Sequence, residues 1–418
     1  IHAETRRVSP GTLSEALNSA DAGDLLLLES GIHEGPLHIT KSITLRGEAD
    51  SIIDGLGIGH IVVVDAPGAA IENLTLRNCR VSETVADAGV WVEKTATKAR
   101  VAGNTITGCR FGVWLHGASQ TEVADNRVIG LEKLSQTERG DCIHLWDADG
   151  ASVTNNELSY CRDGVYMELT SDGDVAGNHI TQSRYGVHSM WCDNSRYSGN
   201  YTHGNLVGLA LMFATRIEAK GNILHNNRAH GLLWVQVTRG SADSNIIIGN
   251  TKGMFVYNSL YNTIRGNLVA RNNLGSHYWG GSEENVMRDN AFIENEIQVK
   301  FVAAKDQVWD SNFWSDYGGW DMDDDGRGEV PYRSNTLVDA LLWNYPLSKL
   351  LLASPAFQVL AVAEREFPVI TVPKVTDLSP QMSPSMTNWK ALLDHYPAQP
   401  SQYYLEMEKL PHVPGSHH

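Results

Sequence analysis

An asparagine that returns at almost fixed spacing is the feature that most constrains how this chain can fold. Between residues 101 and 292 a phrase of the form apolar-x-x-Asn-x-apolar recurs, mostly every 22 or 23 residues and once after 30. A period this short indicates a solenoid, in which each repeat forms one coil. The interval of 30 is read as one regular coil with an insertion of eight residues. The nine positions are Asn104, Asn126, Asn156, Asn178, Asn200, Asn222, Asn245, Asn267 and Asn290.

The composition of each repeat favours strands over helices. Most of these Asn residues are followed, about eight positions later, by Gly and a short apolar stretch such as Gly112-Val-Trp-Leu. Alternating Val, Ile and Leu with Asn and Gly corners is typical of strands joined by turns, whereas helical repeats need about 33 or 34 residues. We therefore predict an all-β fold, a right-handed parallel β-helix with about 22–23 residues per coil. At a fixed corner the Asn amides can bond backbone groups and the Asn of the next coil, so the nine residues form a structural ladder.

Three segments can be distinguished along the chain. Residues 1–24 contain a helix over residues 11 to 23 that caps the solenoid, with Thr12 and Glu15 as a capping box. Residues 25–350 form the β-helix, whose first strands are expected at 25–28, 37–39, 43–45 and 61–64. Residues 351–418 form an irregular tail that cannot continue the coils, because nine of the 14 prolines lie there. A short amphipathic turn is expected at residues 388–396, which could lie along one side of the solenoid.

Charge and termini limit the function classes. The net charge of −16 and the lack of a Lys/Arg run argue against nucleic-acid binding. No apolar segment reaches the length of about 18 residues that a membrane span requires. The chain starts at Ile1 without Met, which suggests a processed or trimmed N-terminus, and residues 415–418 resemble a tag remnant.

The five cysteines do not form metal-binding pairs of the Cys-x-x-Cys type. Cys79, Cys109 and Cys161 share one position of the repeat, so we expect them to form a buried apolar stack rather than disulfides. Cys142 and Cys192 are expected at strand edges.

Aligning the coils on Gly separates the inner and outer positions of the following strand. Residues one and three positions after Gly are apolar and interior by type, as in Val113 and Leu115. Residues two and four positions after Gly are unusually rich in aromatic residues, His and Met. An exposed stripe of this kind is either a binding face or a surface covered by the tail or a loop. Its predicted members are Trp91, Trp114, His116, His144, Trp146, Tyr166, His188, Met190, Met212, Phe255, Tyr257, His277 and Trp279.

Within this stripe a cluster of His and Met predicts a metal site. Met190 and Met212 fall on adjacent coils, and His188 is two residues from Met190 on the same face. Two thioethers and an imidazole suit a soft ion such as Cu(I) and suit Mg or Ca poorly. His144 and His116 lie further along the stripe and are included as candidate copper ligands.

A second candidate metal site lies near the end of the repeats. Asp321, Asp323, Asp325 and Gly326 reproduce the first half of a calcium-binding loop, with Glu329 nine positions along. Position twelve is Tyr332 in place of the bidentate Glu, so the alternatives are a structural Ca or Mg site and a solvated acidic turn.

These residues carry a resemblance to a known family. The Asn ladder, the segments Gly11-Thr-Leu-Ser-Glu-Ala-Leu and Ile43-Thr-Leu-Arg-Gly-Glu48, and the closing run Asn312 to Tyr332 resemble the NosD family of copper-maturation proteins for nitrous oxide reductase. Glu329 stands where that family usually has Asp. The resemblance implies a periplasmic protein without catalytic activity, docked to an ABC transporter that consists of an ATPase and a membrane subunit. It also implies that copper, as Cu(I), arrives from a lipoprotein chaperone and passes to the apo reductase.

The main alternative is a carbohydrate-binding or carbohydrate-cleaving β-helix, a lyase, epimerase or hydrolase. Aromatic stripes stack on sugars, and such enzymes share this solenoid. Carboxylates and arginines are available on the expected face, but a pair of acids at a defined separation cannot be recognised from the repeat. The residues concerned are Asp147, Asp149, Glu168, Asp172, Arg162 and Arg184. A purely structural surface adhesin is a third possibility, and it leaves the His and Met cluster unexplained.

Overall fold

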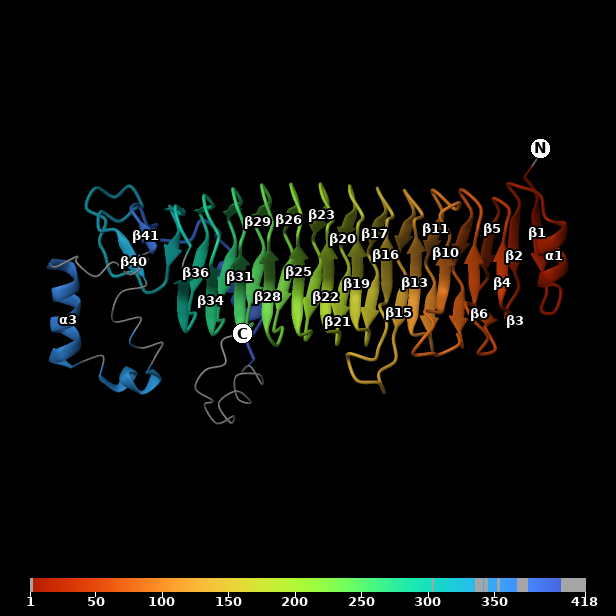
Figure 1. The fold of residues 1–418 in the computed structure, drawn as a ribbon, viewed down its shortest axis with the longest axis horizontal. Coiled ribbons are helices and arrows are strands. Elements are labelled where there is room, and N and C mark those ends of the chain that lie inside the picture. Colours follow the sequence, from red (N-terminus) through yellow and green to blue (C-terminus); the bar gives the residue numbers. More distant parts are fainter. Residues whose placement is uncertain are drawn as a thin grey trace. The chain divides into compact units, whose positions relative to one another are not determined.

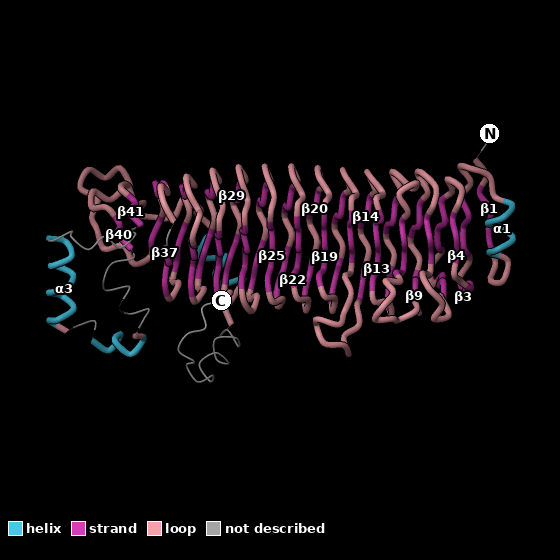
Figure 2. Tube along the Cα trace, viewed as in Figure 1, coloured by secondary structure: helices cyan, strands magenta, loops and turns pink. Residues whose placement is uncertain are grey.

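The coils of this chain form a parallel β-solenoid architecture, as predicted (Figure 1). The computed structural model describes residues 3–302, 304–334, 341, 345–351, 354–366 and 375–399. It divides into two compact units, Ile1–Asn227 and Arg228–His418. In each unit the chain passes in turn through three parallel sheets, called A1, B1 and C1 in unit 1 and A2, B2 and C2 in unit 2. Figure 2 shows how short strands alternate with turns around each coil.

Unit 1 begins with strand β1 and helix α1 (Leu13–Ser19) and then repeats the order A1, B1, C1. Sheet A1 consists of β1 (Thr5–Val8), β2 (Leu25–Leu28), β5 (Thr44–Gly47), β8 (Ala70–Glu72), β11 (Arg100–Ala102), β14 (Glu122–Ala124), β17 (Ser152–Thr154), β20 (Asp174–Ala176), β23 (Arg196–Ser198) and β26 (Glu218–Lys220). Sheet B1 consists of β3 (Gly31–Glu34), β6 (Ser51–Asp54), β9 (Thr75–Arg77), β12 (Thr105–Thr107), β15 (Arg127–Ile129), β18 (Glu157–Ser159), β21 (His179–Thr181), β24 (Tyr201–His203) and β27 (Ile223–His225). Sheet C1 consists of β4 (Leu37–Ile39), β7 (Val62–Val64), β10 (Ala88–Val92), β13 (Phe111–His116), β16 (Ile143–Trp146), β19 (Asp163–Glu168), β22 (Tyr185–Met190) and β25 (Val207–Met212).

Unit 2 repeats this plan and ends in strands and helices outside the regular coils. Sheet A2 consists of β29 (Ser241–Asp243), β32 (Thr263–Arg265), β35 (Val286–Arg288), β38 (Val308–Asp310), β41 (Val375–Asp377) and β40 (Tyr332–Ser334), and its last strand, β40, pairs antiparallel with β41. Sheet B2 consists of β30 (Ile246–Ile248), β33 (Leu268–Ala270), β36 (Ala291–Ile293) and β39 (Phe313–Trp314). Sheet C2 consists of β28 (His230–Val235), β31 (Lys252–Tyr257), β34 (Leu274–Trp279) and β37 (Ile297–Val302). The helices are η1 (Pro346–Leu351), α3 (Pro355–Glu366) and α4 (Trp389–His395).

The strand alternation predicted from the repeat is confirmed. Val113, Leu115, Val165 and Met167, one and three positions after Gly, are fully buried between the sheets. Full burial of such a side chain contributes about 1.5–3 kcal/mol, so each coil of unit 1 stabilises the interior of that unit. Gly112 is required at its position because a Cβ atom there would lie 2.4 Å from the carbonyl oxygen of the next coil.

The Asn ladder is confirmed as a buried hydrogen-bonded row within each unit. In unit 1 the Oδ1 atom of Asn126 accepts bonds from both the backbone and the side-chain amide of Asn104, each at 3.0 Å. The same pattern continues in steps to Asn222, and the row starts at the backbone amide of Leu74. In unit 2 the row runs through Asn245, Asn267, Asn290 and Asn312. Further ladders at other corners were missed, because their members are fewer and mixed with Ser; they include Ser183-Asn205-Asn227 and Asn250-Asn272-Asn295.

Helix α1 is shorter than the predicted helix over residues 11 to 23, and the predicted capping box is wrong. Thr12 precedes the helix, but its hydroxyl donates to the Ser9 carbonyl at 2.8 Å and makes no cap bond. The Thr12 hydroxyl therefore stabilises the turn before the helix and does not cap the helix, contrary to the prediction from the sequence pattern. Among the described residues, no helix combines the length and apolar character that crossing a bilayer requires.

The prediction of a cysteine stack is also wrong. Cys79 is bonded to Cys109 and Cys142 to Cys161, while Cys192 is free and buried. The repeat does place Cys79 and Cys109 at equivalent positions of adjacent coils. The distance between Cα atoms on adjacent coils is one that a disulfide can span. Cys142 occupies the position that is Gly in other coils. Its disulfide partner, Cys161, lies on the following coil.

The tail contributes more regular structure than expected. Strand β41 continues sheet A2, although the Pro-rich composition argued against any further coil. Asp377 closes the Asn row, because its Oδ2 atom accepts bonds from the backbone and side-chain amides of Asn312 at 2.9 and 3.0 Å. Helix α4 confirms the short amphipathic turn predicted at residues 388–396.

Candidate functional site

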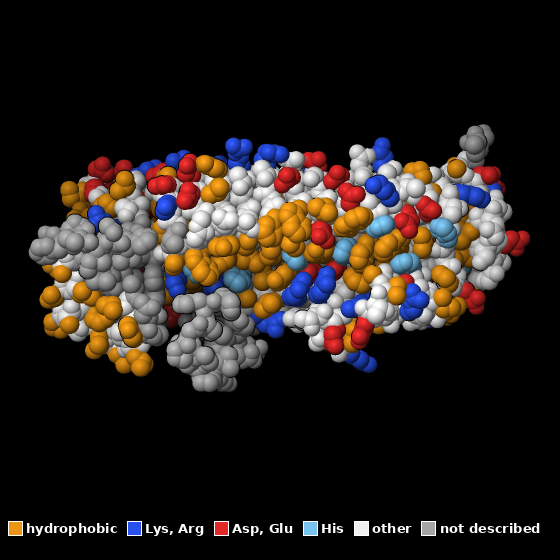
Figure 3. Space-filling view, viewed as in Figure 1, with side chains coloured by type: hydrophobic (Ala, Val, Ile, Leu, Met, Phe, Trp, Pro, Cys, Tyr) orange, Lys and Arg blue, Asp and Glu red, His pale blue; other side chains and the backbone are white. Residues whose placement is uncertain are grey.

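The outward positions of sheet C1 form two side-chain columns that run across the coils. Figure 3 shows the corresponding band of hydrophobic side chains with histidines among them. We call this surface the aromatic face of unit 1, and Trp146 is 37% exposed on it. The first column is Trp91, Trp114, His144, Tyr166 and His188, and the second is His116, Trp146, Glu168, Met190 and Met212.

Stacked rings hold the first part of this face together. The ring centroids of Trp114 and His144 are 3.7 Å apart and nearly parallel, and those of His116 and Trp146 are 5.1 Å apart. Trp91 stacks on Trp114 at 5.2 Å. Because each ring rests on the ring of the next coil, these side chains are fixed in outward orientation.

Two histidines of the face are each held by a buried carboxylate. The Nδ1 atom of His144 lies 2.8 Å from Asp141 Oδ2, and Nδ1 of His188 lies 3.0 Å from Asp163 Oδ2. A carboxylate only accepts hydrogen bonds, so Nδ1 is the donor in both contacts, and Nε2 is the ring nitrogen that is left to bind a ligand. A carboxylate behind the imidazole is the usual outer-sphere arrangement of a metal-binding histidine. Sequence reasoning missed Asp141 and Asp163, because both precede the strand alternation used to identify the columns.

Arginines neutralise these carboxylates from the side. Arg162 Nη2 lies 2.9 Å from Asp141 Oδ2, and Arg184 Nη2 lies 2.7 Å from Asp163 Oδ2. Burial raises the pKa of Asp163, but hydrogen bonds from His188 and Arg184 outweigh this and hold the pKa below its usual value. Asp163 therefore stays ionised and orients His188 without leaving an unpaired buried charge.

Met190 and Met212 lie side by side on β22 and β25, in register and partly exposed, as predicted. His188 is in the neighbouring column, where its partner on β25 is the small residue Ala210. The side chains of His188, Met190 and Met212 thus share one patch, which we call the His-Met patch. His188 and His144 are buried, with 8% and 7% exposure, in contrast to the exposed positions that the sequence predicts.

His144 and His116 lie outside the reach of the His-Met patch. Tyr166 separates His144 from His188, with ring centroids at 4.8 and 4.9 Å. His144 and His188 are therefore about two coil spacings, or roughly 10 Å, apart, and one ion cannot bind both. His116 is nearer to Glu93, with Nδ1 3.3 Å from its Oε2 atom.

The predicted face residues of unit 2 lie together on sheet C2. Phe255 packs edge-on against His277 at 5.2 Å, and Tyr257 lies 6.0 Å from Trp279. Tyr257 and Trp279 are 41% and 42% exposed. We call this surface the aromatic face of unit 2.

The charges of this second face differ from those of unit 1. The Lys252 ammonium lies 5.2 Å from the Phe255 ring centroid. Burial, followed by the positive charges of Lys252 and Lys300, lowers the pKa of His277 to about 3. Both ring nitrogens of His277 are buried without a hydrogen bond. Positive neighbours disfavour a metal cation at this face.

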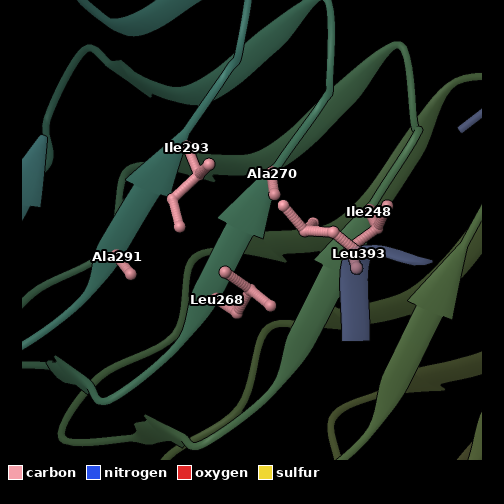
Figure 4. Close-up of a cluster of buried hydrophobic side chains, with 6 residues drawn as sticks. All are labelled: Ile248, Leu268, Ala270, Ala291, Ile293 and Leu393. Atoms are coloured by element: carbon pink, nitrogen blue, oxygen red, sulfur yellow. The ribbon is translucent and has the colours of Figure 1, made fainter. Parts of the chain in front are cut away.

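The described part of the tail packs on a different sheet. Leu393 of α4 joins a buried apolar cluster with Ile248, Leu268 and Ile293 on sheet B2 (Figure 4). Met386 and Trp389 pack against the same cluster. In unit 2 these tail residues therefore cover sheet B2 and not the aromatic stripe on sheet C2.

The acidic loop of unit 2 brings three of its four predicted ligands together. Oxygen atoms of Asp321, Asp323 and Asp325 lie within 4.8 Å of one another. The Glu329 carboxylate instead accepts a bond from the Met322 amide at 2.7 Å. In the described parts of the chain this is the one such group of three His, Cys, Asp or Glu side chains, and none of its members lies on the aromatic face of unit 1.

Three of the carboxylates considered for a carbohydrate enzyme contact a hydroxyl, an ammonium or a backbone amide. Glu168 accepts a hydrogen bond from the Tyr166 hydroxyl at 3.1 Å, and Asp147 lies 3.7 Å from Lys94. Asp149 accepts a bond from the Ser171 amide at 2.7 Å, which supports the turn below the face. Asp172 occupies a turn position with a positive φ of 55°.

A stack of parallel coils with outward columns of aromatic, His and Met side chains defines a β-solenoid with one chemically distinct face. A family described as "Periplasmic copper-binding protein (NosD)" matches residues 130–319. A relative from Pseudomonas aeruginosa, called "Probable ABC transporter binding protein NosD", is 42% identical over 381 residues, covering 87% of this chain and 89% of the relative. A relative of the same description from Stutzerimonas stutzeri is 38% identical, covering 90% and 91%. The chain belongs to the NosD family, whose members are periplasmic.

Solved structures with the same architecture include carbohydrate-active enzymes. A family 28 exopolygalacturonase from Yersinia enterocolitica matches with a TM-score of 0.54 at 9% identity, covering 73% of this chain and 78% of that one. The periplasmic alginate epimerase AlgG matches with a TM-score of 0.50 at 13% identity, covering 72% and 83%. At these identities the likeness shows the fold alone.

Proposed function

We propose that this protein handles copper in the periplasm for the maturation of nitrous oxide reductase, without catalysing a reaction. The observation that carries the proposal is the His-Met patch, in which His188 is oriented by Asp163 beside Met190 and Met212. The description of the family as copper-binding supports the choice of metal. The relatives' names support a role beside an ABC transporter, which we take to consist of an ATPase and a membrane subunit.

The chemistry of the patch fits Cu(I) as a cargo. Thioethers are soft ligands that select Cu(I), and the Nε2 atom of His188 adds a neutral nitrogen ligand. Because the side chains of Met190 and Met212 are partly exposed, an incoming protein could exchange ligands with the ion directly. We infer that a lipoprotein chaperone delivers Cu(I) at this patch and that the apo reductase removes it.

A Cu(I) titration tests the proposal. Under anaerobic, reducing conditions and with a chromophoric Cu(I) chelator as competitor, we expect one tightly bound ion per chain. His188→Ala with Met190→Ala, and separately Met212→Ala, should weaken binding by at least about tenfold, since even losing an outer-sphere partner costs that much. His38→Ala with Met382→Ala is a matched control, because it removes one His and one Met side chain that are exposed and lie outside the patch. Equal affinity in the patch variants and the control would reject this site.

The aromatic face of unit 1 is the proposed contact surface for the copper-donating chaperone. Transfer requires the donor to touch the His-Met patch, and Trp146 is exposed on the same sheet. Trp146→Ala should weaken chaperone binding measured by biolayer interferometry, because exposed aromatics at interface centres contribute most of the affinity. Trp320→Ala, an exposed tryptophan in the acidic-loop region, serves as control. Equal binding of both variants would reject the face as the docking site.

We also propose a structural Ca²⁺ or Mg²⁺ ion in the acidic loop. Asp321, Asp323 and Asp325 supply the oxygen ligands that hard cations prefer, and Glu329 is a further oxygen donor in the same loop. Adding millimolar Ca²⁺ should raise the melting temperature of the parent chain but not that of Asp323→Asn with Asp325→Asn. Identical melting curves with Ca²⁺ and with a chelator would identify the loop as a solvated acidic turn.

Incubation with uronate polysaccharides tests the carbohydrate-enzyme alternative. We expect neither unsaturated products nor epimerised residues, because the name given to the relatives is that of a binding protein. Turnover of any such polymer would overturn the proposal that the protein is not an enzyme.

A further inference from the structure

A second group of histidines gathers on sheet B1, away from the aromatic face. His179 lies on β21, Tyr201 and His203 lie on β24, and His225 lies on β27. The middle residue of each of these strands is fully buried, so the first and third residues point outward. Strand register places His179 beside Tyr201 and His203 beside His225 on neighbouring coils.

The contacts between these side chains are short. The Nε2 atom of His179 lies 3.0 Å from the Nε2 atom of His203, and the two ring centroids are 5.1 Å apart. His179 also stacks on Tyr201 at 5.0 Å with an angle of 10°. The Tyr201 hydroxyl lies 3.4 Å from Nδ1 of His225. The two Nε2 atoms therefore face one another across one coil spacing, with both rings supported.

This separation is close to what a chelated ion needs. Two nitrogen ligands about 2.0–2.1 Å from a tetrahedral ion lie about 3.3 Å apart, so the pair needs to open by only a few tenths of an ångström. Metal binding requires neutral imidazoles.

Glu157 stands beside the pair. It is in register with His179 on the preceding coil, is exposed, and lies 3.4 Å from Arg127 at the surface. A carboxylate at this position can supply an oxygen ligand after a change of rotamer, and water can complete the coordination. His179 is exposed, so an ion can reach the site from solvent.

We propose that His179 and His203 form a chelating site for a divalent transition-metal ion of the Zn²⁺ or Cu²⁺ type, with Glu157 as an auxiliary ligand. Imidazole nitrogen with carboxylate oxygen suits such borderline ions, whereas the thioethers of the His-Met patch suit Cu(I). The two sites lie on different sheets of unit 1 and differ in chemistry. The inference is therefore independent of the proposed copper-transfer function.

Zn²⁺ is the probe for the test, used on the full chain with His417→Ala and His418→Ala to remove the terminal histidines. Competition with a chromophoric zinc chelator should show one site of micromolar or tighter affinity. His179→Ala with His203→Ala should weaken it by at least about tenfold, and Glu157→Gln should weaken it less. His38→Ala is the matched surface control. Circular dichroism should show that the variants keep the fold.

Two outcomes would overturn the site: no Zn²⁺ binding by the parent chain, or equal binding by the parent and the double variant. Met190→Ala with Met212→Ala separates the two proposals, because it should abolish Cu(I) binding and leave Zn²⁺ binding unchanged. Failure of the Cu(I) experiment alone would thus leave this site standing. Nitrogen hyperfine splitting in the Cu²⁺ electron paramagnetic resonance spectrum gives a second readout, and the double variant should lose it.

Discussion

Replacing Asn178 by Ala should destabilise unit 1 more than any surface change of equal size. Asn178 is fully buried in the Asn row. Its Oδ1 atom accepts bonds from the backbone and side-chain amides of Asn156, both at 2.9 Å. Its Nδ2 atom donates to Val153 O at 2.8 Å, Ala176 O at 3.2 Å and Asn200 Oδ1 at 3.0 Å. The substitution removes all five bonds.

The expected cost follows from the groups left behind. The Asn156 backbone amide loses its partner inside the solenoid, and a stranded buried amide costs about 1–3 kcal/mol. Each of the three Nδ2 bonds contributes about 0.5–1.5 kcal/mol, so the free energy of unfolding should fall by about 2.5–7.5 kcal/mol.

Urea unfolding followed by tryptophan fluorescence measures this change, with Asn18→Ala on the exposed side of α1 as the control. The control should stay within about 0.5 kcal/mol of the parent. If Asn178→Ala had the same free energy of unfolding as the control at an unchanged denaturant slope, the ladder would not stabilise the fold and the reasoning would be wrong.

Three further predictions concern stability. Burial lowers the pKa of His230 and of His277 from 6.5 to about 3, so only the unfolded chain is protonated between these values. Each of these two histidines should therefore lower the free energy of unfolding by about 1.4 kcal/mol per pH unit as the pH drops below 6.5, and His277→Gln should remove one such contribution from the slope measured in urea titrations. Cys142→Ser with Cys161→Ser opens a disulfide that spans 19 residues and should cost about 3 kcal/mol, whereas an unchanged urea midpoint would contradict the bond. Asp377→Ala should lower the melting temperature because it strands the end of the Asn row in unit 2, and Asp377→Asn should recover much of the loss, since an amide oxygen can accept the same bonds.

The columns of the aromatic face could be predicted from the sequence because register in a parallel solenoid follows from counting. Once Asn126 and Asn156 mark equivalent corners, His144 must stand one coil from Trp114, and Met190 must stand beside Met212. The carboxylates behind the histidines could not be found in this way. Asp163 reaches His188 across a coil, from 25 positions earlier, and nothing in the spacing distinguishes it from other polar turn residues.

The disulfides and the His179-His203 pair show a second limit of counting. Equivalent repeat positions bring Cys79 and Cys109 near each other, but whether two thiols pack or bond depends on the direction of their side chains. His179 and His203 occupy different positions of the repeat, so no column contains both. Their Nε2 atoms meet because long side chains reach diagonally between adjacent coils.

The sequence alone determined the parallel β-helix, its coil length, the Asn row and the identity of the outward columns, because all of these follow from a local pattern repeated at a fixed period. Tertiary structure alone decided which polar groups meet between coils, how Asp377 closes the row, and which sheet receives α4. Those contacts join residues separated by up to 122 positions, as between Arg271 and Leu393. They depend on side-chain direction and on the path of the tail, and a periodic pattern specifies neither.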